Sequence, residues 1–192
     1  MNLKTTASCP LCGNSMEFSW ETTSIPHFGD ALMIAGTCPC GFRHNDTMLL
    51  TQREPYRYTL PVESQSDLDA RVIRSASGTV RVPEIGVDVE PGYASESYIT
   101  NVEGVLVRIR DIVKFATNSA RQAGDQEKTA RGEDILERIG STLDGRGCMT
   151  LILEDPFGNS AIISSRAEAV RLTEEEVGRL KCGMVVLDVS SS

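Results

Sequence analysis

Two close pairs of cysteines near the N-terminus constrain this chain more than any other feature. The first pair is Cys9 and Cys12, and the second is Cys38 and Cys40. Two cysteines separated by two residues can turn both thiolates toward one metal ion, because the tight turn between them directs both side chains inward. Paired thiols in a chain without an export signal favour metal binding over disulfides. The pairs therefore predict one structural zinc ion held by four thiolates, with strands in the intervening segment.

The second pair leaves the ligand set open, because only one residue separates Cys38 from Cys40. Alternating residues of an extended chain point the same way, so both sulfurs could still bind the ion. His44, four positions after Cys40, is the alternative ligand, whereas His27 is interpreted as a surface or packing residue. Four protein ligands leave no open coordination position, so the expected role of the zinc is structural rather than catalytic.

Charge and composition narrow the classes of partner and activity. The 192 residues carry 19 Lys and Arg against 27 Asp and Glu, a net charge of −8, and no segment forms the basic field that phosphate contacts require. The apolar runs are too short to span a membrane, and the polar N-terminus lacks the apolar core of an export signal. Phosphate-binding loops and nucleophile elbows are absent from the sequence. We therefore expect a non-enzymatic cytoplasmic protein, with the monomer favoured, that binds neither membranes nor nucleic acid.

The chain beyond the cysteine pairs is rich in β-branched residues and turn formers. Strands are predicted over 57–62, 70–76, 79–90, 148–154, 160–165 and 184–189. The strands at 148–154 and 160–165 flank a loop dense in turn-forming residues, so they are predicted to form a β hairpin. The two remaining cysteines, Cys148 and Cys182, are isolated and are expected to be free, at least partly buried thiols.

Two amphipathic helices interrupt the β pattern. The first is predicted to begin at a capping box formed by Thr100 and Glu103. The second spans about 126–143, and a glycine-containing loop joins the two as an antiparallel hairpin. A shorter acidic helix is predicted at 174–180.

Five strings of residues, taken in order, resemble the Zpr-type zinc-finger proteins. The first is the finger itself, with Cys9, Cys12 and Cys38 around a long spacer, and the others follow along the chain at 66–75, 82–86, 100–104 and 155–160. Their joint order, which covers nearly the whole chain, makes the resemblance specific. The shortened second cysteine pair departs from the family's Cys-x2-Cys, and this departure bears on the ligand set.

The resemblance implies a mainly β fold with an α insertion. A zinc ribbon over 1–53 would be followed by a double-stranded β-helix, or jelly-roll-like, domain over 54–192. That second domain would carry the helical hairpin at about 100–145. The residue pattern alone predicts the same order of elements as the resemblance: β segments, then two helices, then more β structure.

The same resemblance implies a zinc-binding adaptor or folding chaperone for a GTPase of the elongation factor one alpha type. Family members are similar in binding that translation factor. We expect contacts with the client from an exposed side chain in the finger and from one loop of the second domain: Phe28, and Asp155, Pro156, Gly158 and Asn159. The alternative is a zinc-ribbon RNA- or ribosome-binding protein of the translation apparatus, which the negative net charge disfavours.

Overall fold

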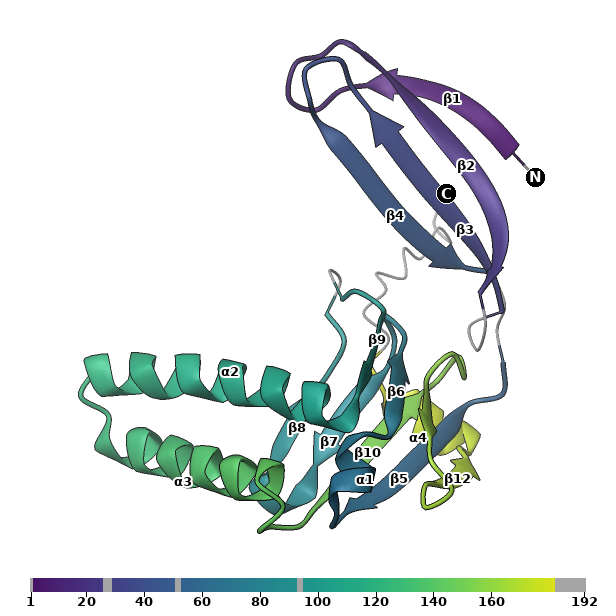
Figure 1. The fold of residues 1–192 in the computed structure, drawn as a ribbon. Helices are drawn as coiled ribbons and strands as arrows, with labels where there is room; N and C mark the ends of the chain where they lie inside the picture. The colour runs from purple at the N-terminus through teal and green to yellow at the C-terminus, as the bar shows by residue number, and fades with distance from the viewer. Residues whose placement is uncertain (1, 26–28, 51–52, 93–94, 182–192) are drawn as a thin grey trace. The chain divides into compact units, whose positions relative to one another are not determined.

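The computed structural model describes residues 2–25, 29–50, 53–92 and 95–181. The chain divides into two compact units, Met1–Arg53 and Glu54–Ser192 (Figure 1). Four predictions fall outside the described residues: those for His27, for Phe28, for Cys182 and for the strand at 184–189. None of the described helices is long and apolar enough to cross a membrane.

The first unit is a four-stranded antiparallel sheet in the order β1-β2-β3-β4. Its strands are Asn2–Ser8, Ser15–Ile25, Gly29–Thr37 and Arg43–Leu49. The register places the β1–β2 and β3–β4 loops at the same end of the sheet, because Ser8 pairs with Ser15 and Thr37 pairs with both Glu17 and Arg43 (Figure 1). These two loops carry the four clustered cysteines.

The second unit contains two sheets that share one aliphatic core. The five-stranded sheet runs β12-β5-β10-β7-β8 and the three-stranded sheet runs β11-β6-β9. Their bounds are Tyr56–Val62 (β5), Arg71–Arg74 (β6), Thr79–Val82 (β7), Val87–Val89 (β8), Tyr98–Asn101 (β9), Met149–Asp155 (β10), Ala161–Ile163 (β11) and Glu168–Arg171 (β12). Buried Leu, Val and Ile side chains from both sheets and from the helices fill this core. The predicted mainly β architecture with a helical insertion is confirmed.

Short helical segments join several of these strands. Helix α1 is Gln65–Leu68, the 3-10 turn is Pro83–Ile85, and α4 is Glu174–Arg179. The 3-10 turn divides the strand predicted over 79–90 into β7 and β8, since Pro83 removes a backbone donor and Gly86 adopts a left-handed φ of 61°. The bend expected at Pro83 is therefore present.

The β hairpin predicted for 148–165 is wrong. Strand β10 pairs with β5 and β7, whereas β11 pairs with β6 in the other sheet. The loop between them crosses from one sheet to the other instead of reversing the chain within one sheet. A turn-rich loop between two strands is compatible with either connection, and only the pairing partners distinguish them.

The helical hairpin consists of α2, Val102–Gln122, and α3, Gln126–Leu143. The two helices lie side by side and extend away from the sheets (Figure 1). The cap of α2 differs from the prediction: Asn101 is the N-cap, and its side chain accepts from the Gly104 amide at 2.9 Å. Thr100 remains in β9, where it pairs with Val72.

Close packing within the hairpin depends on Gly132. A β-carbon at this position in α3 would collide with the hydroxyl of Thr117 in α2, which is itself buried. We expect Gly132→Ala to lower the free energy of unfolding of the second unit by about 1–3 kcal/mol, because the helices must separate. Urea unfolding followed by circular dichroism at 222 nm measures this change.

Gly140 in the same helix supplies the matched control. A β-carbon there meets no atom within 4 Å, and alanine is the better helix former by about 1 kcal/mol. Gly140→Ala should therefore leave stability unchanged or raise it. Equal effects of the two substitutions would show that the Gly132 contact does not limit the approach of the helices.

Candidate metal centre

Four cysteine sulfurs converge at one end of the first unit's sheet. The Sγ atoms of Cys9, Cys12, Cys38 and Cys40 all lie within 4.8 Å of one another. The Cys9–Cys40 sulfurs are 3.7 Å apart and the Cys12–Cys38 sulfurs 3.6 Å apart. Tetrahedral zinc with Zn–S bonds of about 2.3 Å places its sulfurs about 3.8 Å apart. The donor set and its dimensions therefore fit one zinc ion, and the four thiolates would complete its coordination sphere.

The two loops reach this geometry by turns of different length. In the first loop, the Gly13 amide donates to the Cys9 carbonyl at 2.9 Å; in the second, the Gly41 amide donates to the Cys38 carbonyl at 2.9 Å. Both glycines have a left-handed φ, 72° and 94°, which favours glycine at these positions. The second loop is one residue shorter. A tight turn brings the Cys38 and Cys40 sulfurs to the same site, whereas the one-residue spacing alone suggested an extended chain at this pair.

The surroundings of this centre shift the pKa values of two of its thiols in opposite directions. Burial raises the pKa of Cys9, but the backbone amides of Cys12 and Leu11, together with the Cys38 and Cys12 side chains, lower it to about 7. At Cys38, the Cys40 amide lowers the pKa, yet burial and the three neighbouring thiols raise it to about 12. A divalent cation supplies the positive charge that four adjacent thiolates require.

His44 takes no part in this cluster. Its ring lies on β4 and packs edge-on against Phe18, with centroids 5.9 Å apart. The potential metal-binding atoms that gather here belong to the four cysteines alone among the described residues. Cys148 is a free thiol, as expected, but it is exposed and not partly buried.

The loop expected to touch a client is built around a buried carboxylate. Asp155 is 1% exposed, and Pro156 and Asn159 are also buried. Five groups donate to the Asp155 carboxylate: the hydroxyls of Ser75, Ser77 and Ser160, and the amides of Phe157 and Asn159. The Asp155 and Asn159 side chains are therefore buried, and the Asp155 carboxylate, through its five donors, holds the crossing between the two sheets.

A client-binding role of this loop stays a prediction, since the described structure tests only where its side chains lie. Gly158, with a φ of 66°, and Phe157 are its half-buried members. Ser75 and Ser77 were not identified from the sequence. They stand some 80 positions before Asp155, and no local pattern connects them to it.

Comparison with known proteins gives a consistent set of similarities. Residues 3–50 match the model of the ZPR1 zinc-finger domain, and residues 66–181 match that of the ZPR1 jelly-roll domain. A ZPR1-like protein of Methanocaldococcus jannaschii is 41% identical over 94% of this chain and 91% of its own length. One from Pyrococcus horikoshii is 36% identical over 93% and 82%. The zinc finger chaperone zpr1 of Schizosaccharomyces pombe is 27% identical over 80% of this chain, which corresponds to 34% of that longer protein.

Proposed function

Since this chain belongs to the ZPR1 family, we propose that it is a non-enzymatic, zinc-binding folding chaperone or adaptor for a GTPase of the elongation factor one alpha type. The observation that carries this proposal is the match to both ZPR1 domains in one chain, finger first and jelly roll second. A relative that aligns with 80% of this chain is named a zinc finger chaperone. We place the chain in the cytoplasm, where free thiols are kept reduced.

The metal centre and the core support a binding role over a catalytic one. Four thiolates leave the zinc no open position at which a substrate or water could bind. The second unit is filled with aliphatic side chains from its sheets and hairpin. The closed metal site and the aliphatic core each stabilise the fold of one unit, and the folded surface of each unit can then contact another protein.

Each unit presents large apolar side chains that suit contact with an incompletely folded client. Leu11, in the first cysteine loop, is 74% exposed, and Phe115, on α2, is 76% exposed. Apolar side chains exposed to water contribute binding free energy when an apolar surface of a client covers them. Phe28 remains a further predicted contact, outside the described residues.

Client refolding tests this proposal. The elongation factor from the same source is unfolded in guanidinium and diluted with or without this chain, and recovered nucleotide binding is measured. We expect the chain to raise the yield, and the double variant Leu11→Ala/Phe115→Ala to return it nearly to the unassisted level. Val170→Ala removes another exposed apolar side chain, on β12, and serves as the matched control.

An unchanged yield with the intact chain would contradict the chaperone role. The RNA-binding alternative predicts a different result. In that case the chain would bind RNA with an affinity that falls steeply as salt rises, and it would leave the refolding of the elongation factor unaffected.

A further inference from the structure

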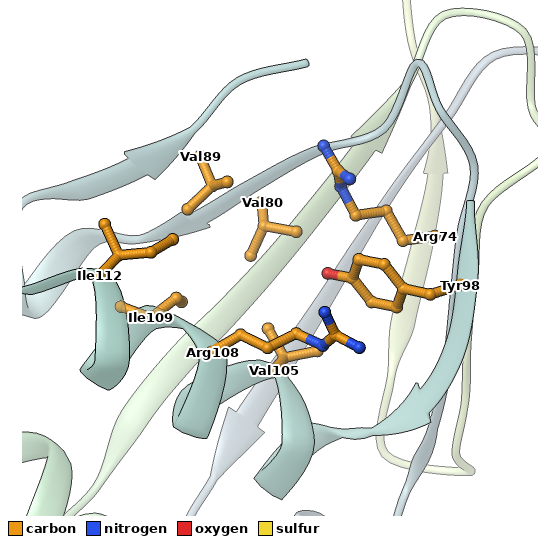
Figure 2. Close-up of a pocket in the computed structure, with 8 residues that line it drawn as sticks. All are labelled: Arg74, Val80, Val89, Tyr98, Val105, Arg108, Ile109 and Ile112. Atoms are coloured by element: carbon orange, nitrogen blue, oxygen red, sulfur yellow. The ribbon is translucent and has the colours of Figure 1, made fainter. Parts of the chain in front are cut away.

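A small pocket in the second unit joins an aliphatic wall to two positive charges. It has a volume of about 140 Å³ and lies among β6, β7, β8, β9 and α2 (Figure 2). The wall consists of Val80, Val89, Val105, Ile109 and Ile112. The polar side is formed by Arg74, Tyr98 and Arg108.

Both guanidinium groups approach the same aromatic ring. The guanidinium carbon of Arg108 lies 4.6 Å from the Tyr98 ring centroid, and that of Arg74 lies 5.5 Å from it. Figure 2 shows the two groups next to this ring, Arg74 above and Arg108 below in that view. The ring attracts each cation, but it does not neutralise either charge.

Arg74 is costly to bury without an anion. Its side chain is only 5% exposed, and its Nε donates to the Gly78 carbonyl at 2.9 Å. Among the described residues, neither Arg74 nor Arg108 forms an ion pair with a carboxylate. Burial lowers the pKa of Arg74 and the charge of Arg108 lowers it further, against the opposing effects of Tyr98 and Asp155.

Within the described part of the chain, the one carboxylate that acts electrostatically on Arg74 is already engaged by other donors. Asp155 influences Arg74 electrostatically, but its two oxygens accept the five hydrogen bonds described above. On the other face of the five-stranded sheet, by contrast, the arginines have a carboxylate partner. Glu154 there forms ion pairs with both Arg57 and Arg81. The pocket therefore holds two like charges whose natural complement, a carboxylate, is not supplied by the described residues.

The volume of the pocket limits the class of ligand that can fill it. Sites for small molecules and cofactors usually enclose about 300–1,000 Å³, so 140 Å³ suits side chains of a peptide better than a nucleotide. Strands β8 and β9 are also the last strands of their sheets within the described chain. The unpaired edge of such a strand can accept the backbone of an extended segment.

We propose that this pocket binds an acidic peptide segment of a partner protein. One Glu or Asp carboxylate pairs with the Arg74 and Arg108 guanidinium groups beside the Tyr98 ring, and a neighbouring aliphatic side chain packs on the valine and isoleucine wall. Arginine pairs recognise carboxylates through charge-assisted, often bidentate hydrogen bonds. The proposal concerns the chemistry of the segment and does not depend on which protein is the folding client.

Nuclear magnetic resonance of the full, 15N-labelled, zinc-loaded chain tests this site. The probe is the blocked peptide Gly-Leu-Glu-Leu-Gly, and its control is the same peptide with Gln in place of Glu. We expect saturable shifts of the Arg74 and Arg108 Nε–H signals and of α2 amides with the Glu peptide, and binding at least about tenfold weaker with the Gln peptide.

Two variants of α2 sharpen the result. Arg108→Gln removes one exposed pocket charge and should weaken peptide binding about tenfold or more. Lys114→Gln removes the same charge from an exposed position of α2 that does not line the pocket, so it should leave the affinity unchanged. Equal binding of the two peptides, equal effects of the two variants, or no saturable shift at millimolar peptide would overturn the proposal. None of these outcomes bears on elongation-factor refolding, which is measured separately.

Discussion

Removal of zinc, or the substitution Cys9→Ser, is expected to unfold Met1–Arg53 while Glu54–Ser192 stays folded. Among the described residues, the hydrophobic cluster at the metal centre is Cys9, Met16 and Cys38, with Phe18 and Phe42 packed against it. Ala31 and Ile34 on β3 are the other buried apolar residues described in the first unit. Cys9 and Cys38 are both members of this cluster and candidate zinc ligands, so loss of the ion is expected to disrupt the cluster. Structural zinc contributes about 10–16 kcal/mol of binding free energy to such small domains.

The chain allows the two units to be followed separately. Its single tryptophan, Trp20, lies in the first unit, where its Nε1 donates to the Thr5 hydroxyl at 2.7 Å and joins β1 to β2. The described helices all belong to the second unit. Chelation should therefore shift Trp20 fluorescence to that of an exposed indole and leave the signal at 222 nm nearly unchanged.

Cys148→Ser is the control for the loss of a thiol, since Cys148 is exposed and lies outside the cluster. It should retain one zinc per chain and the native Trp20 spectrum. A native spectrum after complete removal of zinc would show that the first unit does not need the ion, and would contradict the structural role assigned to it.

Asp155→Ala is expected to destabilise the second unit by about 3–5 kcal/mol, because several buried donors lose their acceptor at once. The Ser75 and Ser160 hydroxyls each lie 2.6 Å from Asp155 Oδ2. The amides of Phe157 and Asn159 have the same carboxylate as their acceptor. Asp155→Asn retains one oxygen and should have an intermediate effect.

Urea unfolding at 222 nm reports this change, since the described helices belong to the second unit. The matched control is Asp144→Ala, in which the lost carboxylate is exposed and paired only with the exposed Arg146. Its effect should stay within about 0.5 kcal/mol. If Asp155→Ala changed stability no more than this control, the crossing between the sheets would not depend on the buried carboxylate.

Features of this fold that depend on neighbouring residues could be predicted from the sequence. The cysteine pairs indicated the metal centre because a turn of three or four residues sets the distance between their sulfurs. Helix α3 was predicted at the bounds observed, Gln126–Leu143, because its apolar residues recur at helical spacing. The bend at Pro83 was predicted for a similar reason, since proline acts on its own backbone.

Features that depend on distant partners were missed. The strands before and after the Asp155 loop looked like one hairpin, since sequence spacing does not reveal that β11 pairs with β6. Asp155 was expected to contact a client, and its burial was missed because its donors Ser75 and Ser77 lie far back in the chain. Arg74 and Arg108 likewise come from a strand and a helix that only the tertiary fold brings to one ring.

The proposed function requires the chain to bind a GTPase of the elongation factor one alpha type. The most direct test is a binding titration of the zinc-loaded chain against the elongation factor from the same source, performed without nucleotide, with GDP and with GTP. We predict saturable binding of one chain to one factor, with an affinity that differs among the three states. An absence of binding in all three states would contradict the proposed function.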